Sequence, residues 1–427
     1  MKGRRVRPRV LVVNKFLHHV GGVETYIKWL STKLYADGFD VAFFGMPPPP
    51  GGAEMALNGP TFHAPYRDYH GSAATKVLSA ADSVYSLGAA KAFRKVVTAF
   101  DPHLVHFQST CYQLTSSVVR QAAKARLPSL TTAHEYFLVC SNQRLWHDSR
   151  ATPCVRCLGQ DIPTRARNIL ETRCVKGSLG ASTIAALELP ISYRTWSSSP
   201  GLVHAPSRYM RDLLSAPTSP VASRVRYLDL SWGDEVAVGG PRRVPRVTYL
   251  GRLSREKGVG VLLSAWPAVT MQIPDARLEI YGSGDQEADL IARAGGMRGI
   301  TFHGRYDPAQ LPEILSRTTL TVHPSEWAEN SPFTVRESLQ AGVPVVVSDV
   351  GGMPEMVSAA TGTVVPPSDE GRLAAAIVAE LKRGRAGSDG LRDAVRVRAL
   401  SDADHVAGLK ALYSEASKAV GRPDVFA

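Results

Sequence analysis

The sequence predicts an α/β protein built from two doubly wound parallel-sheet domains. Its 427 residues suffice for two domains that each bury a core. Short apolar runs alternate with segments of helical periodicity, and this alternation occurs in two successive rounds. The composition, with 44% hydrophobic and 21% charged residues, is that of an ordinary globular protein and argues against extensive disorder.

The first round of alternation lies in the N-terminal half. Its predicted strands are Arg9–Val13, Val41–Phe44, Leu104–Phe107 and Ser129–Ala133. Between the first two strands, apolar residues from Val23 to Leu34 recur at helical spacing, which predicts a helix with one apolar face. The segment from about 140 to 200 has no regular alternation, and we interpret it as an insertion in this domain.

The second round starts near Val244. Its predicted strands are Arg246–Leu250, Ala276–Tyr281, Ile300–Phe302, Thr319–Val322, Val343–Val347 and Thr363–Val365, with helices between them. We therefore predict an N-terminal domain at residues 1–225, a C-terminal domain at 226–405, and a helix and tail at 406–427 that pack back on the N-terminal domain. Ligands of open parallel sheets bind beyond the carboxyl ends of the strands, so functional residues are expected on loops there, in a cleft between two such sheets.

Charge is distributed unevenly between the two halves. Residues 1–225 hold 27 Lys and Arg against 13 Asp and Glu, whereas residues 226–427 hold 23 against 25. A basic half suggests an anionic surface or substrate, and the alternative is a solvated surface tuned for solubility. No apolar run approaches the ~20 residues of a membrane-spanning helix, and Val10–Val13 is too short for a signal-peptide core. These features predict a cytoplasmic protein.

The loop after the predicted strand Arg246–Leu250 carries two cations. Gly251 allows a sharp turn, and Arg252 and Lys257 follow on the same loop. Two fixed cations can clamp a diphosphate, and they stabilise the charge that a nucleoside diphosphate gains as it leaves. The alternative is that both side chains only solvate the loop.

Two carboxylates, Glu329 and Glu337, stand eight residues apart after the strand Thr319–Val322. Pro332 indicates that Glu329 lies in the loop before a helix and Glu337 inside it. The start of that helix would offer backbone N–H groups to a phosphate, from Ser331, Phe333 and Thr334. Glu337 could accept hydrogen bonds from ribose hydroxyls and Glu329 from a sugar hydroxyl, whereas the simpler alternative for both is helix capping.

The run Glu329–Glu355, together with the loop 251–258, resembles the retaining glycosyltransferases of family 4, which have the GT-B fold. The resemblance implies that Arg252 and Lys257 hold the diphosphate, that Glu337 holds the ribose and that Glu329 contacts the donor sugar. Gly282 resembles a turn beside the nucleotide base. It also implies a reaction that retains anomeric configuration, needs no bound metal, and passes the acceptor proton to the leaving phosphate.

The N-terminal half resembles the same family at lower resolution. Gly21 and Gly22 resemble its glycine-rich loop, which approaches donor phosphate or acceptor. His134 follows a predicted strand and resembles the histidine that lies beside the donor sugar, so we assign it a catalytic role with Glu329. The sequence departs from the family at 227–234, where its usual linker is replaced, and at Asn330–Ser331, where many relatives have a Gly-containing turn.

Four of the five cysteines lie in the predicted insertion, at positions 140, 154, 157 and 174. The pair Cys154 and Cys157 forms a CxxC motif, which in a cytoplasmic protein suggests a metal or redox role more than disulfides. A structural zinc ion and ordinary packed thiols both stay open.

The sequence thus predicts a glycosyltransferase that uses a nucleotide-diphosphate sugar and a sugar or lipid-linked acceptor in polysaccharide or cell-envelope glycolipid synthesis. Its basic N-terminal domain could meet an anionic membrane surface from the cytoplasmic side. Two alternatives stay open: an epimerase of nucleotide sugars, and a non-catalytic nucleotide-sugar binding protein. Nucleic-acid binding is disfavoured, because no reading element is recognisable.

Overall fold

The computed structural model describes residues 7–66, 80–233, 244–384 and 386–426. The basic N-terminal residues 1–6 and the residues 234–243, near the predicted domain boundary, lie outside this part of the chain. The protein divides into two compact units: Met1–Ser149 with Cys154–Asp229 and Ala403–Ala427, and Leu230–Asp402 with Arg150–Pro153. Each unit contains one large sheet and is described by itself.

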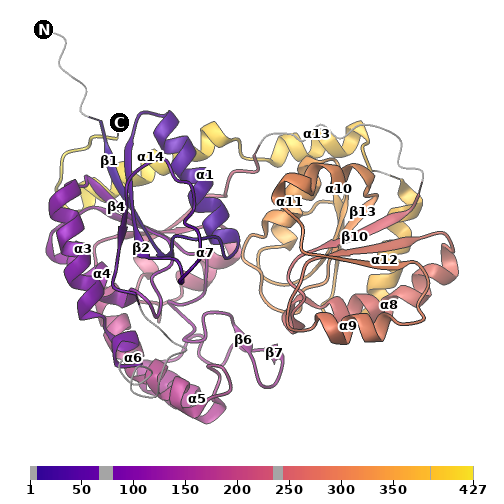
Figure 1. Cartoon of the computed structure of the whole chain (residues 1–427), viewed down its shortest axis with the longest axis horizontal. Coiled ribbons are helices and arrows are strands. Elements are labelled where there is room, and N and C mark those ends of the chain that lie inside the picture. Colours follow the sequence, from indigo (N-terminus) through magenta and orange to yellow (C-terminus); the bar gives the residue numbers. More distant parts are fainter. Residues whose placement is uncertain (1–6, 67–79, 234–243, 385, 427) are drawn as a thin grey trace, which may run out of the picture. The chain divides into compact units, whose positions relative to one another are not determined.

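The first unit is built on a seven-stranded sheet of order β3-β2-β1-β4-β5-β8-β9 in which every pairing is parallel (Figure 1). Its strands are β1 (Arg9–Phe16), β2 (Asp40–Met46), β3 (Thr61–His63), β4 (Leu104–Phe107), β5 (Ser129–Thr132), β8 (Leu202–Ala205) and β9 (Val225–Tyr227). The central strands β4, β5 and β8 are buried along their whole length, as expected for a parallel sheet covered on both faces.

The helices of the first unit are α1 (Gly22–Ala36), α3 (Leu87–Phe100), α4 (Thr115–Lys124), α5 (Ile162–Thr172), α6 (Leu179–Ser198), α7 (Arg208–Leu214) and α14 (Asp402–Ala419). Hydrogen bonds between buried polar groups join the C-terminal helix α14 to the rest of this unit. His106 Nδ1 on β4 lies 2.8 Å from the Tyr413 hydroxyl, and His405 Nδ1 donates to the Asp229 carbonyl over 2.7 Å.

The segment that we interpreted as an irregular insertion contains the two helices α5 and α6 and the short strands β6 (Trp146–His147) and β7 (Thr152–Pro153). No helix was predicted in this segment, yet α6 is a helix of 20 residues with Pro190 inside it. Its apolar residues lie on all sides, since Leu187 is exposed while Ala185 and Leu189 are buried. The sequence therefore shows no single apolar face from which a helix could be predicted.

The second unit is built on a six-stranded parallel sheet of order β12-β11-β10-β13-β14-β15. Its strands are β10 (Arg246–Leu250), β11 (Arg277–Tyr281), β12 (Ile300–Gly304), β13 (Leu320–His323), β14 (Val345–Ser348) and β15 (Gly362–Val365). Its helices are α8 (Val259–Gln272), α9 (Glu287–Ala294), α10 (Leu311–Arg317), α11 (Phe333–Gln340), α12 (Glu370–Arg383) and α13 (Asp389–Arg398). All six strands predicted from the second round of alternation are present.

Strand β14 shows how this sheet is covered on both faces. Val346 packs with Trp266 of α8 and Ile377 of α12. Its neighbours Val345 and Val347 instead pack with Leu339 of α11 and with α13. Because successive side chains of a strand point to opposite faces, the sheet has helices on each side, which is the doubly wound architecture.

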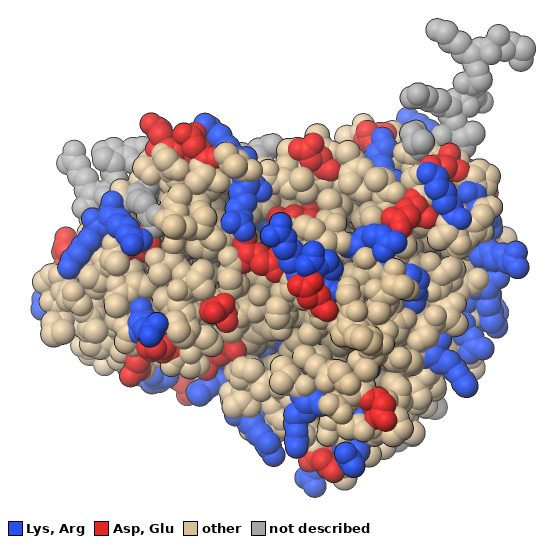
Figure 2. Space-filling view, turned by 180° about the vertical axis from the view of Figure 1, so that it is seen from behind, with Lys and Arg blue, Asp and Glu red and all other residues tan. Residues whose placement is uncertain are grey.

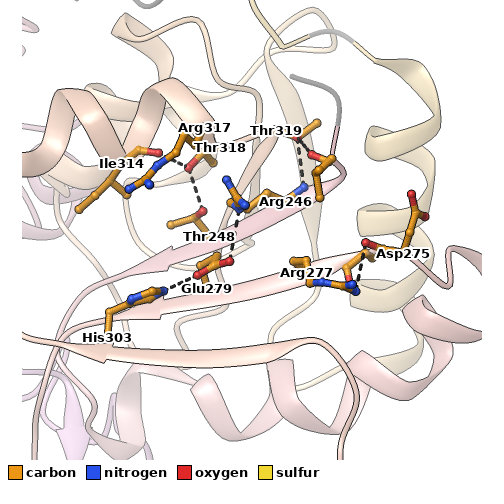
Figure 3. A network of polar contacts seen from close by, with 12 residues as sticks. Arg246, Thr248, Asp275, Arg277, Glu279, His303, Ile314, Arg317, Thr318 and Thr319 are labelled. Carbon is orange, nitrogen blue, oxygen red and sulfur yellow. Dashed lines mark hydrogen bonds and ion pairs between the residues drawn. The ribbon is translucent and has the colours of Figure 1, made fainter. Parts of the chain in front are cut away.

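A polar network crosses one edge of this sheet. Arg246 on β10 forms an ion pair with Glu279 on β11 over 3.3 Å, and Glu279 also pairs with His303 on β12 (Figure 3). The Thr248 and Thr318 hydroxyls lie 2.8 Å apart, joining β10 to the C-cap of α10. Arg246 opens β10 and Thr318 precedes β13, so these contacts brace the sheet toward the amino ends of these strands.

Candidate functional site

The candidate residues of the second unit lie on loops that follow neighbouring strands. The loops 282–286, 251–258, 324–332 and 349–353 follow β11, β10, β13 and β14, which are consecutive in the sheet. Parallel strands end at the same edge, so these loops meet at the carboxyl end of the sheet. This is where ligands bind in open α/β sheets.

Glycines allow three of these loops to approach one another at the backbone. Gly282 has φ +141°, and a Cβ on it would lie 1.8 Å from the Gly251 carbonyl oxygen. Gly258 has φ +70°, and a Cβ there would lie 1.9 Å from the Pro324 carbonyl oxygen. Neither position tolerates a side chain without moving backbone, so glycine is required for this packing.

The predicted residues Lys257 and Glu329 lie in direct contact. Lys257 Nζ donates to Glu329 Oε1 over 2.5 Å, although 72 residues separate them in the chain. Burial alone would raise the pKa of Glu329, but the Lys257 ammonium and hydrogen bonds from Lys257, Trp327 and Ser325 hold that pKa below its usual value. Glu329 is therefore a carboxylate at neutral pH, able to accept hydrogen bonds but not to act as a general acid.

The backbone around Glu329 is fixed by the glycine turn after β14. Gly352 N–H donates to the Glu329 carbonyl over 2.7 Å, and a Cβ on Gly351 would lie 1.9 Å from the same oxygen. The Ser325 hydroxyl donates to Glu329 Oε1 over 2.9 Å. Lys257 Nζ also lies 5.3 Å from the centroid of the Trp327 ring, a cation–π contact. The pair is therefore held from several directions.

Arg252 is exposed, in contrast to Lys257. Its backbone carbonyl accepts from the Tyr249 hydroxyl over 2.8 Å, which anchors the turn at the end of β10. Among the described residues, the Arg252 guanidinium forms no hydrogen bond or ion pair. The structure thus fixes the backbone of Arg252 and leaves its charged end exposed.

Helix α11 begins at Phe333 with Pro332 as its N-cap, so Glu329 lies in the preceding loop and Glu337 inside the helix, as predicted. Burial raises the pKa of Glu337 to about 7. The Ser331 hydroxyl accepts from the buried Arg336, and Thr334 Oγ1 lies 3.4 Å from His323 Nδ1. Glu337 makes no side-chain hydrogen bond to Lys257 or Glu329, so the structure brings only part of the predicted set into contact.

Sequence reasoning missed two residues of this edge. His323 ends β13, and burial lowers its pKa to about 4. The Glu329 carboxylate acts to raise this pKa and the Lys257 ammonium to lower it. Burial raises the pKa of the Tyr306 phenol to about 12, and the negative charge of the nearby Glu337 carboxylate contributes to this rise. The position of His323 at a strand end was the available signal, because the same rule located Lys257 and Glu329.

The first unit has its own cluster beyond the strand ends. Gly21 is the N-cap of α1, and its N–H donates to Glu24 Oε2 over 2.9 Å, while Asn14 Nδ2 donates to Glu24 Oε1 over 3.0 Å. A Cβ on Gly21 would meet no atom within 4 Å. The turn containing Gly21 and Gly22 is therefore open to close approach, but the Gly21 N–H is already bonded.

His134 follows β5 and lies in this cluster. Its Nε2 lies 2.7 Å from Gln108 Oε1, and its ring stands edge-on to Tyr26 with centroids 5.2 Å apart. Burial, with smaller contributions from His204 and Lys15, lowers the pKa of His134 to about 3. The imidazole is neutral at pH 7 and suits hydrogen bonding better than proton donation.

A charged pair stands beside His134. Lys15 Nζ donates to Glu135 Oε1 over 2.8 Å, and the Ser109 hydroxyl donates to Glu135 Oε2 over 2.9 Å. These three residues follow or end β1, β5 and β4, which are neighbours in the sheet. Lys15 was not singled out from the sequence, because no motif surrounds it.

The described residues include no group of three or more His, Cys, Asp or Glu side chains arranged to hold a metal ion. The four cysteines of the insertion nevertheless line one small cavity of the first unit, as free thiols. Within the described part of the chain, no helix is long and apolar enough to cross a membrane.

Comparison with known proteins gives a consistent result. The profile of the family "Glycosyl transferases group 1" matches residues 244–383, and that of the "Glycosyl transferase 4-like domain" matches residues 21–231. A phosphatidyl-myo-inositol mannosyltransferase of Mycobacterium leprae is 32% identical over 178 residues, which cover 41% of this chain and 47% of that protein. A glycogen synthase of Mycobacterium tuberculosis is 35% identical over 169 residues, covering 38% and 40%. The aligned regions thus span less than half of these relatives.

Solved structures show the fold over nearly the whole chain. A sucrose-phosphate synthase from Thermosynechococcus elongatus superposes with a TM-score of 0.69 at 20% identity, covering 97% of this chain and 100% of that one. The Anabaena protein HepE, solved in complex with UDP-glucose, superposes with a TM-score of 0.61 at 16% identity, covering 97% and 99%. At such identities the likeness establishes the architecture alone, and the architecture is that of two parallel-sheet units of GT-B type.

Proposed function

Because the chain belongs to the family 4 glycosyltransferases of GT-B fold, we propose that it transfers a sugar from a nucleotide-diphosphate sugar to an acceptor hydroxyl with retention of anomeric configuration. The observation that carries the proposal is the contact between Lys257 and Glu329 at the carboxyl end of the second sheet. The Lys257 cation suits the anionic diphosphate of a sugar diphosphate, and the ionised Glu329 carboxylate beside it suits the hydroxyl donors of the sugar.

The roles of the donor-binding residues follow from their exposure and charge. Arg252 is exposed, and we assign it and Lys257 to the diphosphate. Glu329, ionised and fixed by Ser325 and Gly352, accepts from a hydroxyl of the donor sugar. Glu337 accepts from the ribose, and ribose binding favours its ionised form. Ser331, Phe333 and Thr334 stand at the start of α11, where backbone N–H groups favour a phosphate.

The proposed reaction depends on electrostatics more than on a protein nucleophile. As the diphosphate leaves it gains negative charge, and Arg252 and Lys257 stabilise that charge in the transition state. The acceptor hydroxyl attacks from the face that the diphosphate leaves, and its proton passes to a leaving phosphate oxygen. His134, which is neutral, contributes a hydrogen bond to the donor sugar. This scheme requires no bound metal.

We propose a sugar or a lipid-linked sugar as acceptor, in polysaccharide or cell-envelope glycolipid synthesis, with the protein in the cytoplasm and peripheral on the inner face of the membrane. The basic character of residues 1–225 and the partial identity to a phosphatidyl-myo-inositol mannosyltransferase support this choice. Figure 2 shows Lys and Arg side chains spread over one face with Asp and Glu among them. If this face contacts a membrane, dispersed positive charges would make the contact, and not one continuous basic patch.

Radiolabelled nucleotide sugars, tested singly with a panel of lipid-linked and oligosaccharide acceptors, check the proposal. We expect one donor to be consumed, and the proton NMR spectrum of the new glycoside to show the anomeric configuration of the donor. Arg252→Ala should impair this transfer, and Arg255→Ala is its matched control, since Arg255 is exposed on the same loop. An inverted product contradicts the mechanism. Interconversion of the donor without transfer would instead indicate an epimerase, and binding without turnover a non-catalytic protein.

A further inference from the structure

A buried arginine side chain in the first unit has no bonded counter-charge among the described residues. Arg165 lies on α5 and is 3% exposed. Within the described residues its guanidinium makes no hydrogen bond or ion pair, and its Nε is buried without an acceptor. Arginine keeps its proton inside proteins, so this is a buried cation without a bonded partner. Such an arrangement is strongly unfavourable unless something else neutralises it.

Arg165 lines a cavity of about 360 Å³, which lies at the lower end of the size range of ligand pockets. The wall is formed by residues of the predicted insertion and of the α7 region, among them Cys157, Gly159, Tyr209 and Thr218. Burial raises the pKa of Tyr209, so its hydroxyl keeps its proton at neutral pH. The cavity therefore combines one fixed cation with hydroxyl groups.

No ionisable neighbour of Arg165 in the described part of the chain forms an ion pair with its guanidinium. Burial raises the pKa of Glu188 to about 7, so this carboxyl is only partly ionised at neutral pH. The cavity wall also includes Asp212, whose Oδ1 accepts from Arg211 Nε over 2.7 Å. Neither carboxyl is bonded to Arg165 in the described residues, so the guanidinium lines the cavity without a bonded partner.

We infer that this cavity binds an oxyanion of the phosphate type, with Arg165 as its fixed cation. The phosphate group can belong to free phosphate or to a glycerol phosphate headgroup, and the volume accommodates either. An entering phosphate would supply the acceptors that the guanidinium lacks and would relieve the cost of its burial. The inference is independent of the transfer reaction, because binding alone tests it.

The test compares the whole protein with Arg165→Met, which keeps a side chain of similar length and removes the charge. Arg167→Met is the matched control, because Arg167 is exposed on the same helix and only approaches Glu171 at 3.9 Å. Isothermal titration with inorganic phosphate and with glycerol 3-phosphate measures binding. We expect at least tenfold weaker binding of both probes to Arg165→Met and less than a twofold change for the control. Arg165→Lys, which keeps a charge, should bind more weakly than wild type but measurably.

Thermal unfolding in phosphate-free buffer gives a second readout. Arg165→Met should unfold at the same or a higher temperature than wild type, because a buried unpaired charge has been removed, and phosphate should stabilise only the wild type. Tighter binding of glycerol 3-phosphate than of phosphate would assign a headgroup site, and equal binding an inorganic anion site. Absence of binding, or equal binding to Arg165→Met, overturns the inference. So does one zinc per chain in a protein that binds neither probe, since metal-bound thiolates would then neutralise Arg165.

Discussion

The contact between Lys257 and Glu329 makes a quantitative prediction for Glu329→Gln. Their side chains are 24% and 10% exposed, so the pair lies between the exposed and the fully buried case. Breaking a fully buried pair costs about 3–5 kcal/mol, and an exposed pair contributes about 0–1 kcal/mol. Glutamine keeps neutral hydrogen bonds, so we expect a loss of about 1–2 kcal/mol in the free energy of unfolding at pH 7.5, measured by urea titration.

The pH dependence of that loss follows from the lowered pKa of Glu329. A carboxylate with a depressed pKa contributes stability above its ordinary value of 4.5, and this stability is lost as the pH falls through the folded-state pKa. The difference between wild type and Glu329→Gln should therefore be full at pH 6–8 and disappear in acid. Equal stabilities at pH 7.5 would refute the proposed strength of the pair.

The same substitution tests the role of Glu329 in transfer. Removing one preorganised charged group from a transition state typically lowers turnover about 10²–10³-fold. We expect a loss of this size at saturating donor. Glu326→Gln is the matched control, because Glu326 lies on the same loop and its carboxylate accepts from Ser368 Oγ over 2.8 Å, away from Lys257. Full turnover by Glu329→Gln, or an equal loss in the control, would refute the assignment.

Three further changes test the rest of the site. Arg252→Ala should weaken nucleoside diphosphate binding about 10–100-fold, measured by calorimetry. The free energy of unfolding should not change, because the Arg252 side chain is exposed. Unchanged affinity would count against the diphosphate role. Glu337, with its pKa of about 7, ionises between pH 6 and 8, so nucleotide affinity should rise about tenfold over this range. Glu337→Gln should remove this pH dependence. An affinity of the wild type that does not change with pH would contradict the ribose assignment. Gly351→Ala should lower the free energy of unfolding by about 1–3 kcal/mol and lower turnover, because its Cβ meets the Glu329 carbonyl. Gly384 has the same φ of +61° but lies in open space, so Gly384→Ala should lower the free energy of unfolding less. Equal losses in the two variants would show that backbone strain alone causes them.

The fold was predictable where the hydrophobic pattern is strong. Strand β14, from Val345 to Ser348, is buried throughout and lies between glycine and proline signals, so the sequence alone identified it. Strands β3 and β9, of three residues each, were missed, because such short strands give no recognisable period. Helix α6 was missed for the opposite reason, since its apolar residues lie on all sides.

The candidate site was predictable as a set of positions but not as a set of contacts. The rule that loops follow parallel strands placed Lys257 and Glu329 at one edge, yet nothing in the spacing showed that Nζ would lie 2.5 Å from Oε1. The pKa values were likewise inaccessible, because the neutral state of His134 depends on burial by residues far away in the chain. The buried charge of Arg165 left no trace in the sequence, where it reads as a polar position of an irregular segment.

The central claim is that the second unit binds the diphosphate of a nucleotide sugar through its cations. Isothermal titration of nucleoside diphosphates into wild type and into Lys257→Met tests it most directly. We predict binding to wild type, with a dissociation constant that rises at least tenfold in Lys257→Met while its urea unfolding stays cooperative. Equal affinities in two folded proteins would contradict the account.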